Sequence, residues 1–220
     1  MPARSRRPQP HRKIDPPALA GVHLESFALD ELKNDFRCEQ RLVDEAAQAD
    51  VHAASVVFDS CEIKRSALER SVLARIRLID LRLERSNASN AKWEGARLRR
   101  VEIIRCRLTG LSLAQAECHD LMLQDCKGDF LVLAGSKIKN ARFEDCILAE
   151  TDFARAQLDN VVFSNCDLRN ANFESARLNS VDVRGSALDG IRLEASQLSG
   201  LTIDPTQALT IVHLLGATIA

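Results

Sequence analysis

Hydrophobic residues recur every five positions through most of this chain. From Phe58 to Ile203 this spacing defines thirty positions, and twenty-seven of them are Leu, Ile, Val, Phe or Trp. The exceptions are Ala88, Cys118 and Gly128. A period of five fits neither an α-helix, with 3.6 residues per turn, nor a strand whose side chains alternate between two faces. The pattern therefore predicts a repeat architecture.

A second series of small or aliphatic residues lies two positions before each member of the first. It runs from Val56 to Leu201, and no member of either series is charged. Charged residues make up 28% of the chain, so in this stretch all of them occupy the other three slots of each unit. Each unit of five is therefore expected to turn two side chains inward and three toward water.

Four such units would close one square coil of twenty residues if the chain turns a corner in each unit. Stacked coils would then place residues twenty apart above one another. The cysteines fit this register, because four of them stand at that spacing: Cys106, Cys126, Cys146 and Cys166. Two pairs of phenylalanines fit it as well: Phe143 with Phe163, and Phe153 with Phe173.

Several units resemble the A-(D/N)-(L/F)-x-x motif of the pentapeptide-repeat family: Ala141-Arg142-Phe143, Thr151-Asp152-Phe153, Cys166-Asp167-Leu168 and Ala171-Asn172-Phe173. The resemblance covers thirty units, or 150 of 220 residues. It implies an all-β solenoid, a right-handed quadrilateral β-helix of about seven to eight coils over residues 56–203, with the handedness taken from the family alone. Proline is absent between Pro17 and Pro205, as expected where backbone N–H groups must bond to the next coil.

The five-residue pattern is absent or broken before residue 56. Residues 1–17 are rich in Arg and Pro and are predicted to form a disordered basic tail, with a nucleic-acid-binding arm as the alternative. Residues 18–55 are predicted to form an N-terminal cap and a degenerate first coil, with Gln48 where an aliphatic residue should stand. A cap would protect the unpaired backbone groups of the first coil.

Residues 204–220 are predicted to form a C-terminal capping α-helix. Asp204 suits the N-cap, Pro205 the first helical position, Gln207 the capping box and Gly216 the helix stop. The helix is apolar on almost all sides, more than a lid over the last coil needs. It resembles the helix through which several pentapeptide-repeat proteins dimerise, which implies an end-to-end homodimer; a monomer whose tail folds back is the alternative. The candidate interface residues are Leu209, Ile211, Val212, Leu214 and Leu215.

Composition is typical of one soluble domain, with 30 basic and 31 acidic residues and 45% hydrophobic residues. No apolar run approaches the ~20 residues that span a bilayer, and no secretion signal follows the basic N-terminus, so we expect a cytoplasmic protein without a membrane segment. Seven cysteines, six of them in inward slots, disfavour a secreted disulfide scaffold.

Nothing in the sequence indicates an enzyme. The five histidines are scattered, no Ser-His-Asp arrangement or glycine-rich phosphate loop is present, and the carboxylates occupy outer slots. We therefore expect no catalytic residue, cofactor or metal. The cysteine column is interpreted as buried filler, because a line of sulfur atoms on one wall does not offer the tetrahedron that zinc prefers.

Charge is distributed unevenly along the repeats. Residues 64–107 contain thirteen Lys or Arg against five Asp or Glu, and residues 117–204 contain nine against fifteen. Arg65, Arg85 and Arg105 stand twenty residues apart, where like charges repel unless water, acidic neighbours or an anionic partner offsets them. The basic coils are thus either ordinarily solvated or a binding site.

Phe130 occupies an outer slot beside Gly128. It either swings over the gap that the glycine leaves in the core, which we favour, or stands exposed for a partner. With the arginines of the basic coils it completes the set of candidate partner-binding residues: Arg65, Arg77, Arg85, Arg97, Arg99, Arg100, Arg105 and Phe130.

Three functions remain open. The first is a non-enzymatic, rigid scaffold that binds a protein partner. The second follows from the resemblance, because some family members mimic duplex DNA and protect DNA gyrase or topoisomerase IV from quinolones, giving antibiotic resistance. A net charge of −1 and the lack of projecting loops speak against that role. The third and weakest hypothesis is direct nucleic-acid binding through the basic coils, since exposed aromatic residues for base stacking are lacking.

Overall fold

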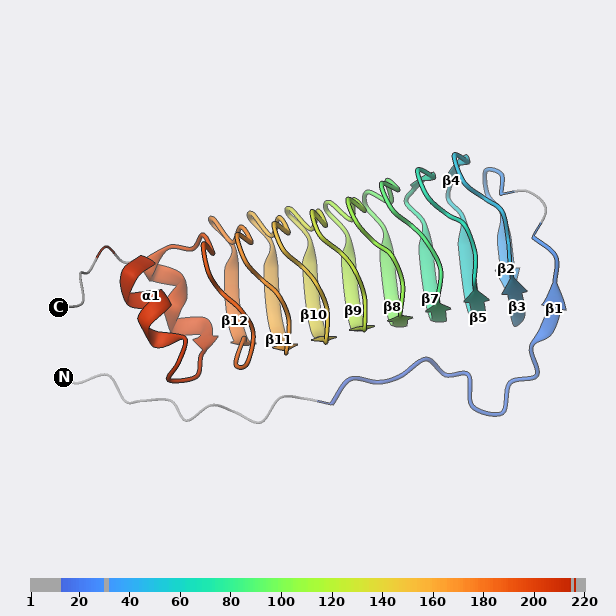
Figure 1. Ribbon diagram of the computed structural model, residues 1–220. Coiled ribbons are helices and arrows are strands. Elements are labelled where there is room, and N and C mark those ends of the chain that lie inside the picture. Colours follow the sequence, from blue (N-terminus) through green and yellow to red (C-terminus); the bar gives the residue numbers. More distant parts are fainter. Residues whose placement is uncertain (1–12, 30–31, 215, 217–220) are drawn as a thin grey trace.

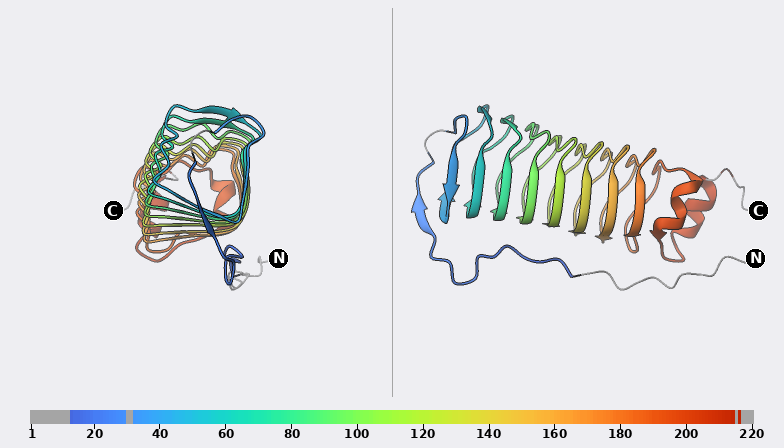
Figure 2. Two further views of the ribbon diagram at one scale, coloured as in Figure 1. Left: turned by 90° about the vertical axis from the view of Figure 1, so that its right-hand side faces the viewer. Right: turned by 180° about the vertical axis from the view of Figure 1, so that it is seen from behind.

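The chain winds into a four-sided pillar of stacked parallel coils. The structure, a computed structural model, describes residues 13–29, 32–214 and 216. Figure 1 shows the pillar from the side, and the left view of Figure 2 shows its four walls along the axis. The solenoid has about nine turns and ends in two short helices. This confirms the predicted all-β solenoid.

The described residues form thirteen strands, one long strand in each regular coil and short ones near the ends. The N-terminal strands are β1 (Glu25–Phe27), β2 (Arg37–Glu39), β3 (Arg41–Asp44), β4 (His52–Ala54), β5 (Val57–Lys64) and β6 (Val72–Ala74). The remaining long strands are β7 (Arg77–Glu84), β8 (Arg97–Ile104), β9 (Glu117–Gln124), β10 (Lys137–Glu144), β11 (Gln157–Ser164) and β12 (Arg177–Asp182). The C-terminal elements are the 3-10 helix η1 (Ala195–Gly200), β13 (Leu201–Thr202) and α1 (Ala208–Leu214).

Neighbouring coils pair in parallel at a register of twenty residues. Leu78 lies opposite Leu98, and Phe143 opposite Phe163. The main sheet runs in the order β1-β3-β5-β7-β8-β9-β10-β11-β12-β13, with β2 added on β5, and β4 pairs with β6. Between the strands, isolated bridges such as that of Ala67 with Asn87 keep the same register. The prediction that four units of five close one coil is confirmed.

Each corner of the coil is turned by a residue in the left-handed region. Most positions whose numbers end in 0 or 5 have a positive φ, from 44° at Arg65 to 74° at Gly185. Neither an α-helix nor a strand contains such residues at regular spacing. A left-handed residue every fifth position therefore explains why the hydrophobic period is five.

The two hydrophobic series point inward as predicted, and phenylalanines fill the C-terminal half of the core. Phe143, Phe153, Phe163 and Phe173 are each at most 2% exposed. Phe143 stacks on Phe163, and Phe153 on Phe173, with ring centroids 4.7 Å apart in both pairs. The two stacks meet edge to face, with the rings of Phe153 and Phe163 5.7 Å apart. Both arrangements are favourable for aromatic rings.

A first coil precedes the regular hydrophobic pattern, within the segment predicted to form a cap and a degenerate coil. Residues 36–55 form a coil in the same register, because β2 pairs with β5 and β4 with β6. Gln48 is buried in this coil. Its Oε1 accepts a hydrogen bond from the Leu32 N–H (2.9 Å), and its Nε2 donates to the Leu29 carbonyl (3.0 Å). The apparent break in the pattern therefore fixes the capping segment in place.

Residues 13–24 run back along the outside of the pillar, as both views in Figure 2 show. Pro17 is buried, and the Ala18 N–H donates to an Asp80 carboxylate oxygen at 2.8 Å. Residues 13–17 therefore depart from the predicted disordered tail. Residues 1–12 of that tail lie outside the described residues.

The regular repeat ends before the predicted limit at Ile203, because η1 interrupts it. Gln197 points inward there, and its Nε2 donates to the carbonyls of Phe173 and Ala176, both at 2.7 Å. Gln207 does the same for Val183 and Ser186, also at 2.7 Å. In regular coils the Ala156 carbonyl, one coil before Ala176, accepts a backbone N–H. The two glutamine amides therefore replace backbone donors that the next coil would supply.

The predicted capping box and glycine stop are present, but α1 begins only at Ala208, after a turn that contains Pro205. Asp204 Oδ1 accepts from the Gln207 N–H at 3.1 Å, and Gln207 Oε1 accepts from the Asp204 N–H at 3.0 Å, which is a capping box. Gly216 has a φ of 80° and donates to the His213 carbonyl, as a residue that ends a helix does.

Candidate functional site

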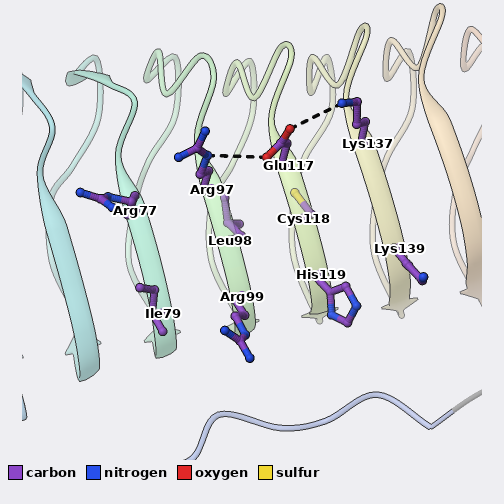
Figure 3. A pocket seen from close by; sticks show the side chains of 10 residues that line it. All are labelled: Arg77, Ile79, Arg97, Leu98, Arg99, Glu117, Cys118, His119, Lys137 and Lys139. Carbon is purple, nitrogen blue, oxygen red and sulfur yellow. Dashed lines mark ion pairs between the residues drawn. The ribbon is translucent and has the colours of Figure 1, made fainter.

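An open groove of about 570 Å³ runs across strands β7 to β10 on one wall of the pillar (Figure 3). Its outer side chains are mostly cationic, and Leu98 and Cys118 lie beneath them. We call this surface the basic groove and define it by six residues: Arg77, Arg97, Arg99, His119, Lys137 and Lys139. The five Arg and Lys side chains are all exposed.

The groove follows from the coil register. Alternate residues of a strand share a face, so parallel strands in register turn their outward positions into continuous rows. One row consists of Arg77, Arg97, Glu117 and Lys137, and the other of Ile79, Arg99, His119 and Lys139. Coils ~4.8 Å apart thus align two ladders of charge along the pillar axis.

The cations of the groove are only partly neutralised. Glu117 serves two of them, with its carboxylate oxygens 3.6 Å from Arg97 Nε and 3.6 Å from Lys137 Nζ. Arg77, Arg99 and Lys139 form no ion pair with any residue that the structure describes. Because exposed pairs at this distance are weak, the groove keeps a clear positive potential.

His119 stands between Arg99 and Lys139 in the second row (Figure 3). Its Nδ1 lies 2.6 Å from Asp120 Oδ2, and the Asp120 side chain is only 6% exposed. This contact fixes the ring orientation, so the imidazole edge faces the groove.

Arg100 differs from the other arginines of this region because it is committed to a buried carboxylate. Its Nε donates to Asp80 Oδ1 at 2.5 Å, and its Nη2 contacts the other Asp80 oxygen. Burial would raise the pKa of Asp80, but hydrogen bonds from Arg100 and the Ala18 N–H outweigh it and lower that pKa. Arg100 therefore holds the N-terminal segment and the corner together, and it does not join the groove.

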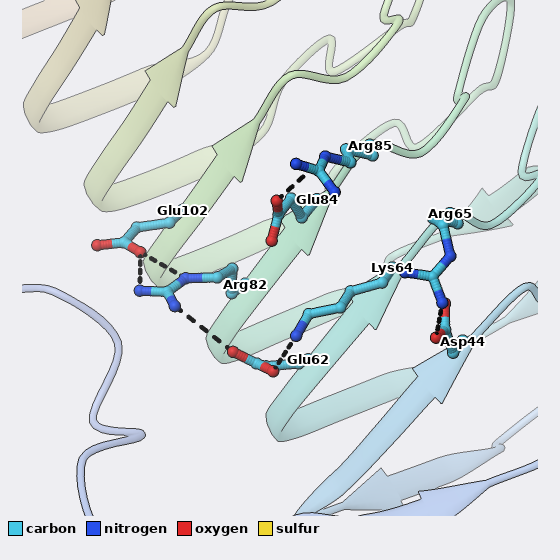
Figure 4. A network of polar contacts seen from close by, with 8 residues as sticks. All are labelled: Asp44, Glu62, Lys64, Arg65, Arg82, Glu84, Arg85 and Glu102. Carbon is cyan, nitrogen blue, oxygen red and sulfur yellow. Dashed lines mark hydrogen bonds and ion pairs between the residues drawn. The ribbon is translucent and has the colours of Figure 1, made fainter.

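The arginine column of residues 65, 85 and 105 lies at a different corner and is offset by acids. Arg65 pairs with Asp44 and Arg85 with Glu84, as Figure 4 shows, and Arg105 Nε lies 3.8 Å from Asp125. The repulsion within this column is therefore offset by acidic neighbours, one of the explanations that the sequence left open. These three candidates are not brought together with the groove.

A neighbouring wall carries a self-neutralising network (Figure 4). The Arg82 guanidinium lies between Glu62 (3.5 Å) and Glu102 (2.8 Å), and Lys64 Nζ lies 2.8 Å from Glu62. Paired charges of both signs leave little net potential on this wall. The contrast marks the groove as the place where positive charge accumulates.

Lys137, Lys139 and His119 were missed because charge was counted along the chain. The segment that contains them is acidic on average, yet its acids lie mainly on other walls. Sorting residues by their position within each twenty-residue coil would have placed all three beside Arg97 and Arg99. Charge per wall is therefore the informative quantity.

Phe130 is 52% exposed, so the preferred expectation that it covers the gap beside Gly128 is wrong. A Cβ on Gly128 would lie 3.2 Å from Leu148 Cδ2 and 3.8 Å from Leu108 Cβ. Core side chains of the adjacent coils therefore already fill that space, and the aromatic ring is left outside.

The C-terminal helix uses its apolar residues in two ways. Ile211 is 6% exposed, and Leu214 packs against the core. Leu209 and Val212 are 57% and 36% exposed. Leu215, the fifth candidate interface residue, lies outside the described residues.

The described cysteines are buried and free, and burial raises the pKa of Cys106 to about 11 and that of Cys118 to about 12. Neutral thiols of this kind are poor nucleophiles and poor metal ligands. Within residues 13–29, 32–214 and 216, no three His, Cys, Asp or Glu side chains are grouped to hold a metal ion. None of the helices in this part of the chain has the length and apolarity to cross a membrane.

Family models for pentapeptide repeats match the chain. The model described as a pentapeptide repeat region matches residues 96–173 and 136–210, and the model for eight copies of the repeat matches residues 76–113. The chain belongs to the pentapeptide-repeat family. A comparison with curated proteins found no match.

Solved structures of other pentapeptide-repeat proteins share the fold at low identity. HetL, involved in heterocyst differentiation regulation in the cyanobacterium Nostoc sp. strain PCC 7120, is 17% identical, with 73% of this chain and 86% of HetL covered and a TM-score of 0.42. A trypsin-treated variant of QnrB1, a plasmid-mediated fluoroquinolone resistance protein, is 17% identical over 86% of this chain and 99% of its own, with a TM-score of 0.45. Rfr23 from the cyanobacterium Cyanothece 51142 is 17% identical, with 54% of this chain and 91% of Rfr23 covered and a TM-score of 0.34.

Proposed function

We propose that this pentapeptide-repeat protein is a non-enzymatic scaffold that binds an acidic segment of a partner protein along the basic groove. The observation that supports this most is the pair of in-register rows with five exposed cations and one carboxylate. Like charges in such rows repel each other. An anionic partner would relieve that repulsion.

The rigidity of the wall favours binding. Each groove strand is held by backbone hydrogen bonds to coils on both sides, so little backbone ordering is needed when a partner docks. Positive potential would also steer an acidic partner toward the wall, with a rate that falls as salt rises.

The partner is proposed to be protein, and not nucleic acid, because of what lies between the cations. Ile79 and Leu98 line the groove, and it contains no aromatic side chain other than the His119 ring. Single-stranded nucleic acids depend on stacked bases for much of their affinity. An extended acidic peptide needs only cations and a partly apolar floor.

Charge reversal tests this proposal. The probe is a fluorescein-labelled twelve-residue poly-glutamate peptide, followed by fluorescence anisotropy at increasing salt. The double variant Arg99→Glu/Lys139→Glu should weaken its binding at least about tenfold. The control is Arg155→Glu/Arg192→Glu, which makes the same charge change outside the groove.

Equal losses in both double variants would mean that only net charge matters, and no binding of the peptide at low salt would overturn the proposal. Tighter binding of a single-stranded DNA with the same charge would favour the nucleic-acid alternative. DNA mimicry toward gyrase or topoisomerase IV draws no support from the groove, because a mimic of DNA requires acidic surface.

We also propose that two copies associate end to end through α1. Leu209 and Val212 expose apolar surface on a helix that Ile211 already anchors to the last coil, and a closed two-fold contact would cover it. The variant Leu209→Ser/Val212→Ser should convert a dimer to a monomer in sedimentation velocity. Phe130→Ser, an exposed apolar-to-polar change far from α1, should leave the dimer intact; a wild-type monomer at all concentrations would refute the contact.

A further inference from the structure

Phe130 is an aromatic residue in a backbone conformation and an environment that do not suit it. Its φ is 58°, and no other aromatic residue in the described ranges has a positive φ. Bulky residues are uncommon there. In the same column Gly110 precedes it and Glu150 follows it, and its N–H bonds to the Ala149 carbonyl at 3.0 Å. Gly110 has no side chain and the Glu150 side chain ends in a carboxylate, and the Phe130 ring stays 52% exposed.

A second exposed apolar side chain lies on the next coil. Ile147 is 43% exposed, and its carbonyl accepts the Gly128 N–H at 2.8 Å. Phe130 and Ile147 therefore belong to two adjacent coils that are bonded to each other. Ala149 lies two residues after Ile147 and accepts the Phe130 N–H, and its small side chain leaves space on the outer surface beside both apolar groups.

Carboxylates surround these two side chains. Asp129 and Glu150 flank Phe130, and neither pairs with a cation in the part of the chain that the structure describes. Asp145 is exposed, and within the described ranges its carboxylate accepts an amide hydrogen bond from Asn165 and no ion pair. Two nearby cations lack a carboxylate partner among the described residues: Lys127, one coil before Ile147, and Arg107, one coil before Lys127. Three carboxylates therefore face two cations around the apolar pair, and the rim keeps a net negative charge.

This surface faces away from the basic groove. Cys118 lies beneath the groove, and Leu148, thirty residues later, lies beneath Ile147. Thirty residues are one and a half coils, which places the two on opposite walls. The apolar surface is therefore independent of the groove and of the function proposed for it.

We propose that Phe130 and Ile147, with the carboxylates of Asp129, Asp145 and Glu150, form an acidic-rimmed docking surface for a basic amphipathic segment of a partner protein. The segment would place an apolar side chain against Phe130 and Ile147 and lysine or arginine side chains against the rim. Charge complementarity identifies this occupant, since an acidic or neutral segment would leave the rim unpaired. Exposed aromatic side chains are frequent anchors of such contacts.

The probe for this surface is a labelled peptide of alternating Lys and Leu, twelve residues long, followed by fluorescence anisotropy. Phe130→Ala should weaken its binding about tenfold. Asp129→Asn/Glu150→Gln should weaken it less and flatten its dependence on salt. Both variants change exposed or half-exposed side chains, and far-ultraviolet circular dichroism checks that the fold is kept.

Two controls separate this surface from others. Leu209→Ala removes an exposed apolar side chain from α1, and Lys139→Glu alters the basic groove. Neither variant should weaken binding of the Lys-Leu peptide. Equal binding by the wild-type protein and Phe130→Ala would overturn the proposal. A Phe130→Ala variant that forms a smaller oligomer than the wild-type protein would overturn it as well, because the surface would then be a contact between copies.

Discussion

Replacing Phe163 by alanine should lower the free energy of unfolding by about 3–5 kcal/mol. Phe163 is fully buried, stacks on Phe143 and meets Phe153 and Phe173 edge to face. The cavity left by the ring cannot close, because backbone ladders to the coils on both sides hold the wall in position. Equilibrium urea unfolding, followed by circular dichroism, would measure the loss.

Phe130→Ala is the matched control for this prediction. It removes the same side chain from the same solenoid, but Phe130 is 52% exposed and has a positive φ that alanine would share. Its effect should stay within about 0.5 kcal/mol. Similar losses for the two variants would show that burial in the phenylalanine cluster does not control stability.

Replacing Gly200 by alanine should detach the C-terminal cap. A Cβ at this position would overlap the backbone carbonyl of Leu178, and its next neighbour would be Leu178 Cβ at 3.2 Å. Backbone atoms cannot rotate away as a side chain would. The junction of η1 and β13 would have to move, and with it the pairing of Leu201 with Val181. Overpacking of this kind costs about 1–3 kcal/mol or more.

Hydrogen exchange of residues 195–214 and limited proteolysis would detect this detachment, with the long strands still protected. Gly185→Ala is the comparison, because a Cβ there meets nothing within 4 Å although the φ of 74° strains any other residue. If Gly200→Ala exposes the cap no more than Gly185→Ala does, the close approach to Leu178 is not what requires glycine.

Three buried glutamines close the two ends of the solenoid: Gln48 at the N-terminal end, and Gln197 and Gln207 at the C-terminal end. From sequence, Gln48 looked like a defect, and Gln197 occupied an outer slot of an assumed repeat. Each amide instead bonds backbone groups that lack a partner in a further coil. Such a role was not predictable, because the identity of an unpaired backbone group depends on where the stack ends.

The basic groove shows a similar limit. Arg100 was predicted as a candidate together with Arg97 and Arg99, but it pairs with Asp80 and does not join the groove. Lys137 and Lys139, forty residues beyond Arg97 and Arg99, share their wall. Residues adjacent in sequence, such as Arg99 and Arg100, thus have different roles, whereas residues forty positions apart lie on the same wall.

The sequence by itself determined the coil. A five-residue spacing of apolar side chains, without charge in either inward slot, permits only a chain that turns a corner in every unit, and the twenty-residue register follows. The capping box of Asp204 and Gln207 was also readable, because it is a local interaction. Tertiary structure alone decided which charges remain unpaired, that Phe130 lies outside, and how the ends are closed. These properties arise between residues of different coils, so their energies depend on neighbours that only the stacked structure brings together.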